Sequence, residues 1–65
     1  MSEVFKVINE FEARKVDRMI FNTKEFDIEE SDIAEFEKYG YKVEYIKFEF
    51  VEEYGFADIF SITKG

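Results

Sequence analysis

The clearest hydrophobic pattern in the sequence is a helical one in the middle of the chain. Ile33 and Phe36 are three positions apart, within a segment, 28–39, that has an apolar residue at each end. Residues three or four positions apart lie on the same face of an α-helix. Lys38 falls in the expected last turn and Gly40 follows it, which is typical of a helix that ends at a left-handed glycine. The pattern therefore predicts a helix over residues 28–39.

The start of this helix is rich in carboxylates. Asp27 is the expected N-cap because Glu30 lies three residues later, as in a capping box, and Ser31 is an alternative cap that would shorten the helix. The helix dipole favours acidic side chains near an N-terminus. Seven of the thirteen residues in the segment 25–37 are acidic and none is basic, so helix-start electrostatics explains only part of this charge.

The segment after Gly40 has the alternation of two β-strands. Glu53, Tyr54 and Gly55 are expected to form the loop between them, because a three-residue hairpin loop needs a left-handed residue at its last position. β-Branched and aromatic residues dominate both segments, which favours β structure. The expected neighbours on one apolar face are Phe48 opposite Phe60, Ile46 opposite Ile62, and Phe50 beside Phe56.

The first of these strands carries apolar residues on both of its faces. One alternating set consists of Tyr41, Val43 and Tyr45, and the set on the opposite side consists of Ile46, Phe48 and Phe50. Both sets can cover one core only if a β-bulge near Tyr45 and Ile46 switches the register. Without a bulge, the sheet would expose a patch around Tyr41 and Tyr45 that suits a partner or a homodimer.

The N-terminal third allows two interpretations. A helix would place four apolar side chains on one arc behind a serine cap, namely Val4, Val7, Ile8 and Phe11 after Ser2. Alternatively, residues 4–11 and 15–22 form a hairpin, which the density of β-branched and aromatic residues favours. The turn of that hairpin, residues 12–15, contains no Gly, Asn or Asp, which counts against it.

These elements predict an α+β protein with one helix packed on one face of a small, mainly antiparallel sheet. The favoured element order is β-β-α-β-β, and the alternative is α-β-α-β-β. A chain of 65 residues is expected to form one small domain, residues 1–65. Its core is marginal, because a chain of this length buries only about 60% of the surface that it exposes when unfolded.

The net charge of −7 is unevenly distributed. Residues 1–24 have five basic and four acidic side chains, whereas residues 25–65 have four basic and twelve acidic ones. Direct binding to DNA, RNA or an anionic membrane would have to overcome phosphate repulsion, so we expect none of these partners. The acidic part of the chain favours solubility and a basic partner.

The absence of His and Cys removes most routes to chemistry. Disulfides and thiolate or imidazole metal sites are excluded, and the commonest general base and nucleophile are missing. The sequence has no phosphate-binding glycine loop, and the oxygen-rich segment 27–37 lacks the spacing and the glycine of a calcium-binding loop. We therefore expect no enzyme activity, no cofactor and no dedicated metal site.

Two further absences bear on localisation. No apolar run approaches the roughly 18 residues of a membrane span, and the N-terminus lacks the basic and apolar regions of a signal peptide. A cytoplasmic protein without a membrane partner is therefore expected.

The acidic run and two tyrosines are the candidate site for a protein partner. A solvated helix usually mixes lysines among its glutamates, whereas here only Lys38, at the end, does so. On the predicted helix, Glu30, Glu35 and Glu37 should point away from Ile33 and Phe36, where a basic partner would relieve their repulsion. The predicted partner-binding residues are Glu25, Asp27, Glu29, Glu30, Glu35, Glu37, Tyr41 and Tyr45.

These features predict a small acidic protein-binding module that engages a basic surface of a larger protein. If that surface normally holds nucleic acid, the chain would act as a competitive inhibitor, a DNA mimic, for example of a nucleic-acid enzyme or RNA polymerase. In composition and size the chain is similar to short acidic inhibitors encoded by bacteriophages and mobile elements. Its element order resembles that of small proteins that bind bacterial RNA polymerase, and no motif identifies a family.

Two alternatives remain open. The chain could be a non-catalytic structural or regulatory subunit, such as a homodimer whose acidity provides solubility, or an acidic antitoxin-like partner of a basic toxin. Salt separates the first alternative from the mimic, because a mimic loses affinity as salt rises, whereas a dimer held by Tyr and Phe burial tolerates it.

Overall fold

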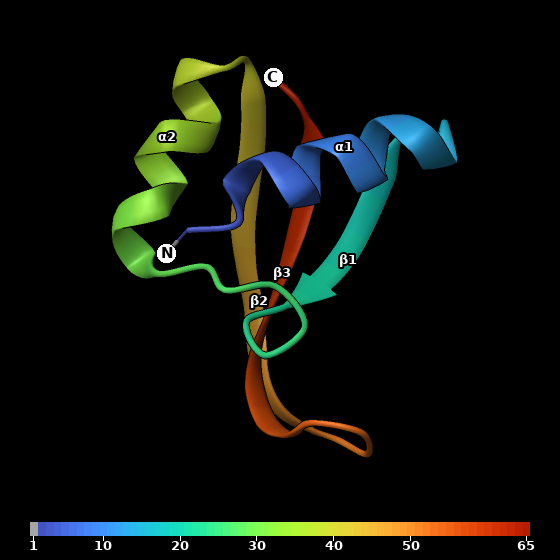
Figure 1. Ribbon diagram of the computed structural model, residues 1–65, viewed down its shortest axis with the longest axis vertical. Helices are drawn as coiled ribbons and strands as arrows, with labels where there is room; N and C mark the ends of the chain where they lie inside the picture. The colour runs from blue at the N-terminus through green and yellow to red at the C-terminus, as the bar shows by residue number, and fades with distance from the viewer. Residues whose placement is uncertain (1) are drawn as a thin grey trace.

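The computed structural model describes residues 2–65 and shows an α+β fold, which confirms the predicted class (Figure 1). Within these residues, two α-helices, one short 3-10 helix and three β-strands follow one another. In order they are α1 (Val4–Arg14), β1 (Arg18–Asn22), η1 (Glu30–Asp32), α2 (Ile33–Lys38), β2 (Tyr41–Val51) and β3 (Gly55–Lys64). The element order is therefore α-β-α-β-β, the alternative of the two orders considered.

The N-terminal third is a helix, so the favoured β-hairpin over residues 4–11 and 15–22 is wrong. In α1 the side chains of Val4, Val7, Ile8 and Phe11 are all buried. A strand would have placed Val4 and Ile8 on one face and Val7 and Phe11 on the other. Only the helix gathers all four on a single stripe against the sheet, and this tertiary burial outweighs the β propensity of the segment.

The three strands form one antiparallel sheet in the order β1-β3-β2, with β3 in the centre. Met19 of β1 and Val43 of β2 both pair with Ile62 of β3, and all three side chains are buried. Directly opposed residues point to the same face. In Figure 1, α1 crosses in front of the sheet and α2 lies beside β2.

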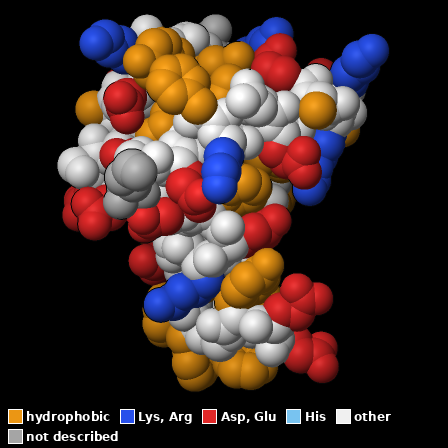
Figure 2. Space-filling view, viewed as in Figure 1, with side chains coloured by type: hydrophobic (Ala, Val, Ile, Leu, Met, Phe, Trp, Pro, Cys, Tyr) orange, Lys and Arg blue, Asp and Glu red, His pale blue; other side chains and the backbone are white. Residues whose placement is uncertain are grey.

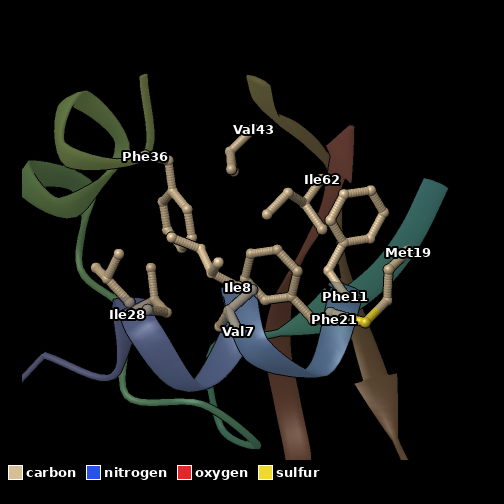
Figure 3. Packing of buried hydrophobic residues seen from close by; sticks show 10 residues of the cluster. Val7, Ile8, Phe11, Met19, Phe21, Ile28, Phe36, Val43 and Ile62 are labelled. Atoms are coloured by element: carbon tan, nitrogen blue, oxygen red, sulfur yellow. The ribbon is translucent and has the colours of Figure 1, made fainter. Parts of the chain in front are cut away.

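The hydrophobic core lies between this face of the sheet and the two α-helices (Figure 3). Phe36 of α2, Val7 of α1 and Ile62 of β3 are its most deeply buried large side chains. The ring of Phe21 lies 6.3 Å from that of Phe36 and 5.9 Å from that of Phe60. The core thus joins all the main elements through the helix-facing side of the sheet.

The middle helix begins later than residue 28 and is capped differently from the prediction. The chain first forms η1, and Ile28 is buried before it. The backbone N–H of Glu29 donates a hydrogen bond to Asp32 Oδ2 at 2.8 Å, so the expected cap at Asp27 is wrong. Asp27 instead contacts the start of α1, where its N–H donates to Glu3 Oε1 at 2.8 Å.

Both internal glycines have the left-handed conformation that the sequence indicates. Gly40 has a φ of +88° and ends α2, and Gly55 has a φ of +82° after the hairpin loop. The loop itself is residues 52–54, because Gly55 already pairs with Val51. It therefore lies one residue earlier than expected.

This change shifts the register between β2 and β3. Phe48 faces Asp58 and not Phe60, and Ile62 pairs with Val43 and not with Ile46. Phe50 and Phe56, which were expected only to share a face, are direct partners. The register shifts again between Tyr45 and Lys47, which confirms the predicted bulge at Tyr45 and Ile46. After the bulge, Phe60 faces Tyr45.

Beyond the bulge, β2 and β3 continue as a two-stranded extension, which we call the hairpin arm and define as residues 46–58. The last pair between β1 and β3 is Asn22 with Ile59, so β1 does not accompany the arm. Figure 1 shows the arm projecting past both helices. Phe48, Phe50 and Phe56 are consequently 58–61% exposed, so the helices do not cover this part of the apolar face predicted for the hairpin.

A candidate protein-binding groove

A groove of about 770 Å³ opens between the η1–α2 segment and the sheet. Its walls come from both helices of that segment, and its floor comes from β2, β3 and the end of β1. The lining residues are Thr23, Ile28, Glu29, Glu30, Ile33, Ala34, Glu37, Val43, Tyr45, Asp58 and Phe60. Four of these eleven side chains are acidic and none is basic, so the groove is a strongly acidic surface with an apolar floor.

The helical wall is set by the spacing of its residues. Glu30, Ile33, Ala34 and Glu37 are three or four positions apart and therefore lie along one side of the η1–α2 segment. Glu30 and Glu37 thus border the same groove as Ile33. The sequence placed these glutamates away from both Ile33 and Phe36, whereas in the structure they line the groove together with Ile33 and only Phe36 is buried.

The floor of the groove is aromatic. Tyr45 and Phe60 face each other across β2 and β3, with ring centroids 5.5 Å apart and an edge-to-face angle of 72°. Tyr45 is 56% exposed, whereas Phe60 is partly buried against the core. The ring of Tyr45 is therefore held in place by Phe60 and still accessible to a ligand in the groove.

Asp58 is a groove residue that the sequence interpretation missed. Its backbone N–H donates to Thr23 Oγ1 at 3.3 Å, and its carbonyl accepts the Thr23 N–H at 3.1 Å, so the backbone at this position is fixed. Period-two alternation from Ile62 through Phe60 places Asp58 on the helix-facing side of β3. The sequence feature that could have identified Asp58 is an acidic residue in an alternating series that is otherwise apolar at Phe60 and Ile62.

The ion pairs among residues 2–65 lie outside the groove. They join Lys6 to Glu3 at 2.6 Å and Lys47 to Glu49 at 3.0 Å, and three further pairs join Arg14 to Glu10, Lys42 to Glu44 and Lys64 to Glu12. Within residues 2–65, no Lys or Arg lies within 4 Å of the carboxylates that line the groove. The Glu29 carboxylate accepts the backbone N–H of Asp32 in the capping box of η1, and a bound cation would lower the repulsion among the groove carboxylates.

The structure brings half of the predicted partner-binding residues together. Glu29, Glu30, Glu37 and Tyr45 line the groove, whereas Glu25, Asp27, Glu35 and Tyr41 do not. Figure 2 shows carboxylates on the side of the molecule that carries η1 and α2, others on the opposite side and on the projecting arm, and apolar surface on that arm. The acidic run is therefore wrapped around more than one side of the protein.

Tyr41 belongs to the edge of the core and not to a patch with Tyr45. Its ring lies edge-on to that of Phe11, with centroids 6.0 Å apart, and its hydroxyl donates to Glu12 Oε1 at 3.1 Å. Partial burial raises the pKa of the Tyr41 hydroxyl, and the hydrogen bond to the Glu12 carboxylate raises it further.

Two further observations concern metal binding and membrane crossing in the part of the chain that the structure describes. Between residues 2 and 65, no cluster of three or more Asp, Glu, His or Cys side chains could hold a metal ion. Neither is there, in the same part of the chain, a helix with the length and apolar character needed to cross a bilayer.

Comparison with known proteins finds no matching family model, no matching curated protein and no matching solved structure. The groove and the residues that line it therefore carry the functional interpretation.

Proposed function

We propose that this chain is a small acidic protein-binding module that binds a basic segment of a larger protein in the groove. The observation that carries this proposal is the set of four carboxylates around an aromatic floor, with no Lys or Arg among the lining residues. An ordinary solvated surface does not need such a hollow, and a nucleic-acid site would need the opposite charge.

The chemistry of the groove favours arginine in the bound segment. Glu30 and Glu37 can each accept charge-assisted hydrogen bonds from a guanidinium, which offers five donors in a planar fork. The exposed face of Tyr45 can stack on the same group, which adds a cation–π contribution of about 0.5–1 kcal/mol at an accessible site. Lysine lacks the planar fork and should bind less tightly.

Competition with nucleic acid is the finer part of the proposal. Basic protein surfaces rich in arginine often serve to bind phosphates, and carboxylates on this chain could occupy the same positions. Residues 25–65 have a charge balance of −8, which supports long-range attraction to such a surface. On this proposal the chain inhibits its partner by occupying a nucleic-acid-binding surface.

The proposal is tested by binding a fluorescein-labelled arginine-rich peptide, measured by fluorescence anisotropy. The groove variant is Glu29→Gln/Glu30→Gln/Glu37→Gln. The control variant, Glu25→Gln/Glu52→Gln/Glu53→Gln, makes the same change in net charge at three exposed carboxylates outside the groove. Exposed ion pairs contribute about 0.2–1 kcal/mol each, so the groove variant should bind about 3- to 100-fold more weakly.

The control variant should lose much less affinity, and Tyr45→Ala should weaken binding without any change in charge. Affinity should also fall as ionic strength rises, because the carboxylates are accessible to solvent. Equal losses in the groove and control variants would show that only the net charge matters, and the groove would then have no role.

A further inference from the structure

The hairpin arm has an aromatic cluster that no other part of the described chain covers. The rings of Phe48 and Phe56 are stacked with centroids 5.5 Å apart, and Phe50 meets Phe56 edge-to-face at 5.4 Å. Each ring is 58–61% exposed. Since a phenylalanine buries about 200 Å² when fully covered, the three rings expose about 350 Å². A patch of this size on a small protein is often an interaction surface.

The same arm has an unpaired strand edge. In the sheet order β1-β3-β2, strand β2 is bonded to β3 on one side only. Every second residue of such an edge directs its backbone N–H and C=O outward, where another strand can pair with them. Figure 1 shows α2 beside the first half of β2, whereas the arm extends beyond it. The edge accessible to a partner is therefore the segment 46–50.

The sequence of this edge is complementary to itself. It reads Ile-Lys-Phe-Glu-Phe over residues 46–50. When two such segments run antiparallel about a two-fold axis through Phe48, Lys47 of one copy lies opposite Glu49 of the other, and Ile46 lies opposite Phe50. Both charged pairs then fall on one face and all the apolar residues fall on the other.

We propose that two copies of this chain associate through antiparallel pairing of their β2 edges in the hairpin arm. A second copy supplies what each arm lacks, namely backbone partners for the edge and an aromatic row that continues from Phe48. It also adds a further opposite charge to Lys47 and to Glu49, which pair with each other at 3.0 Å within one copy. Two-fold symmetric interfaces require this kind of self-complementarity. A heterologous partner would have to match the charge order, the aromatic face and the edge without the help of symmetry.

The size of the interface sets the strength of the association. The aromatic patches of two copies amount to about 700 Å², which is below the roughly 1,200 Å² of a standard stable interface. The dimer should therefore be weak and in exchange with the monomer, with association visible between about 10 µM and 1 mM. The acidic groove of each copy binds its ligand separately in this proposal.

Sedimentation velocity across this concentration range, at near-physiological ionic strength, measures the association. Lys47→Glu and Glu49→Lys each place like charges opposite one another at two symmetric positions, and each should weaken dimerisation about 10-fold. The double variant Lys47→Glu/Glu49→Lys restores opposite charges with the native net charge and should restore dimerisation.

The matched control is Lys42→Glu, which breaks the Lys42–Glu44 pair of the same spacing on the same strand outside the arm. It should dimerise like the native chain. A native chain that stays monomeric up to about 1 mM would overturn the proposal, and so would a Lys47→Glu variant that dimerises normally. A double variant that fails to recover, while its circular dichroism spectrum is native, would overturn the antiparallel register.

Discussion

The core is covered by the helices and the hairpin arm is not, so truncating a phenylalanine to Ala should lower the free energy of unfolding much more in the core, at Phe36, than in the arm, at Phe48. Phe36 is completely buried, and truncating such a residue to Ala typically costs about 3–5 kcal/mol. A domain of 65 residues has a total stability of about 3–10 kcal/mol. Phe36→Ala should therefore remove at least a large part of the stability and leave a substantial unfolded population at room temperature.

Phe48 is 61% exposed. About 60–100 Å² of its surface is covered, if a fully buried ring contributes about 150–250 Å². At about 25 cal/mol per Å², Phe48→Ala should cost at most about 2.5 kcal/mol. Urea unfolding followed by circular dichroism, at low micromolar protein to exclude dimerisation, measures both variants. If Phe48→Ala were as destabilising as Phe36→Ala, the arm would be part of the core and the register described above would be wrong.

Three further changes test local features. The pKa of Tyr41 is raised, so its stabilising effect is complete below its unfolded pKa of about 10 and is lost as pH rises through its folded pKa. The melting temperature of Tyr41→Phe should therefore fall less at alkaline pH than that of the native chain. The pKa of Glu3 is lowered by its hydrogen bond to Lys6, so its stabilising effect is present above about pH 4.3 and is lost as pH falls. The melting temperature of Glu3→Gln should therefore fall less on acidification than that of the native chain. Gly55→Ala should cost about 1–2 kcal/mol in urea unfolding, because a Cβ there contacts nothing within 4 Å and the cost comes from the left-handed backbone alone; Gly55→Asn should cost less.

The turns that contain glycine were the most predictable part of the fold. Gly40 follows α2 and Gly55 follows the hairpin loop, and both have the expected left-handed backbone, which glycine adopts without a steric cost. The bulge at Tyr45 and Ile46 was predictable for a different reason. Two apolar series of opposite phase on one strand can share a face of the sheet only through an inserted residue, although here the second series continues that face onto the exposed arm.

The N-terminal helix was not predictable from propensity. The apolar residues from Val4 to Phe11 are β-branched or aromatic, which favours strands in isolation, and the decisive factor was burial of all four on one stripe against a sheet formed by distant residues. The predicted register of the β2–β3 hairpin was wrong by a smaller amount. A loop one residue earlier than expected moved Phe48 from Phe60 to Asp58.

The sequence predicted that the site is acidic, but it predicted only part of the residues that line the groove. The sequence indicated that carboxylates gather before and within α2, and the predicted residues that line the groove are Glu29, Glu30, Glu37 and Tyr45. It could not show that a hollow lies between α2 and the sheet, because that depends on how far the short helix stands from Phe60. Asp58 entered the site through this long-range packing.

The most direct test of the central claim is an amide NMR titration of the native chain with the arginine-rich peptide. Binding in the groove predicts chemical-shift changes concentrated at Glu30, Ala34, Glu37, Tyr45 and Asp58. Shifts spread evenly over all acidic surfaces, including the hairpin loop at residues 52–54, would show that the peptide responds to net charge alone and would contradict the groove as a binding site.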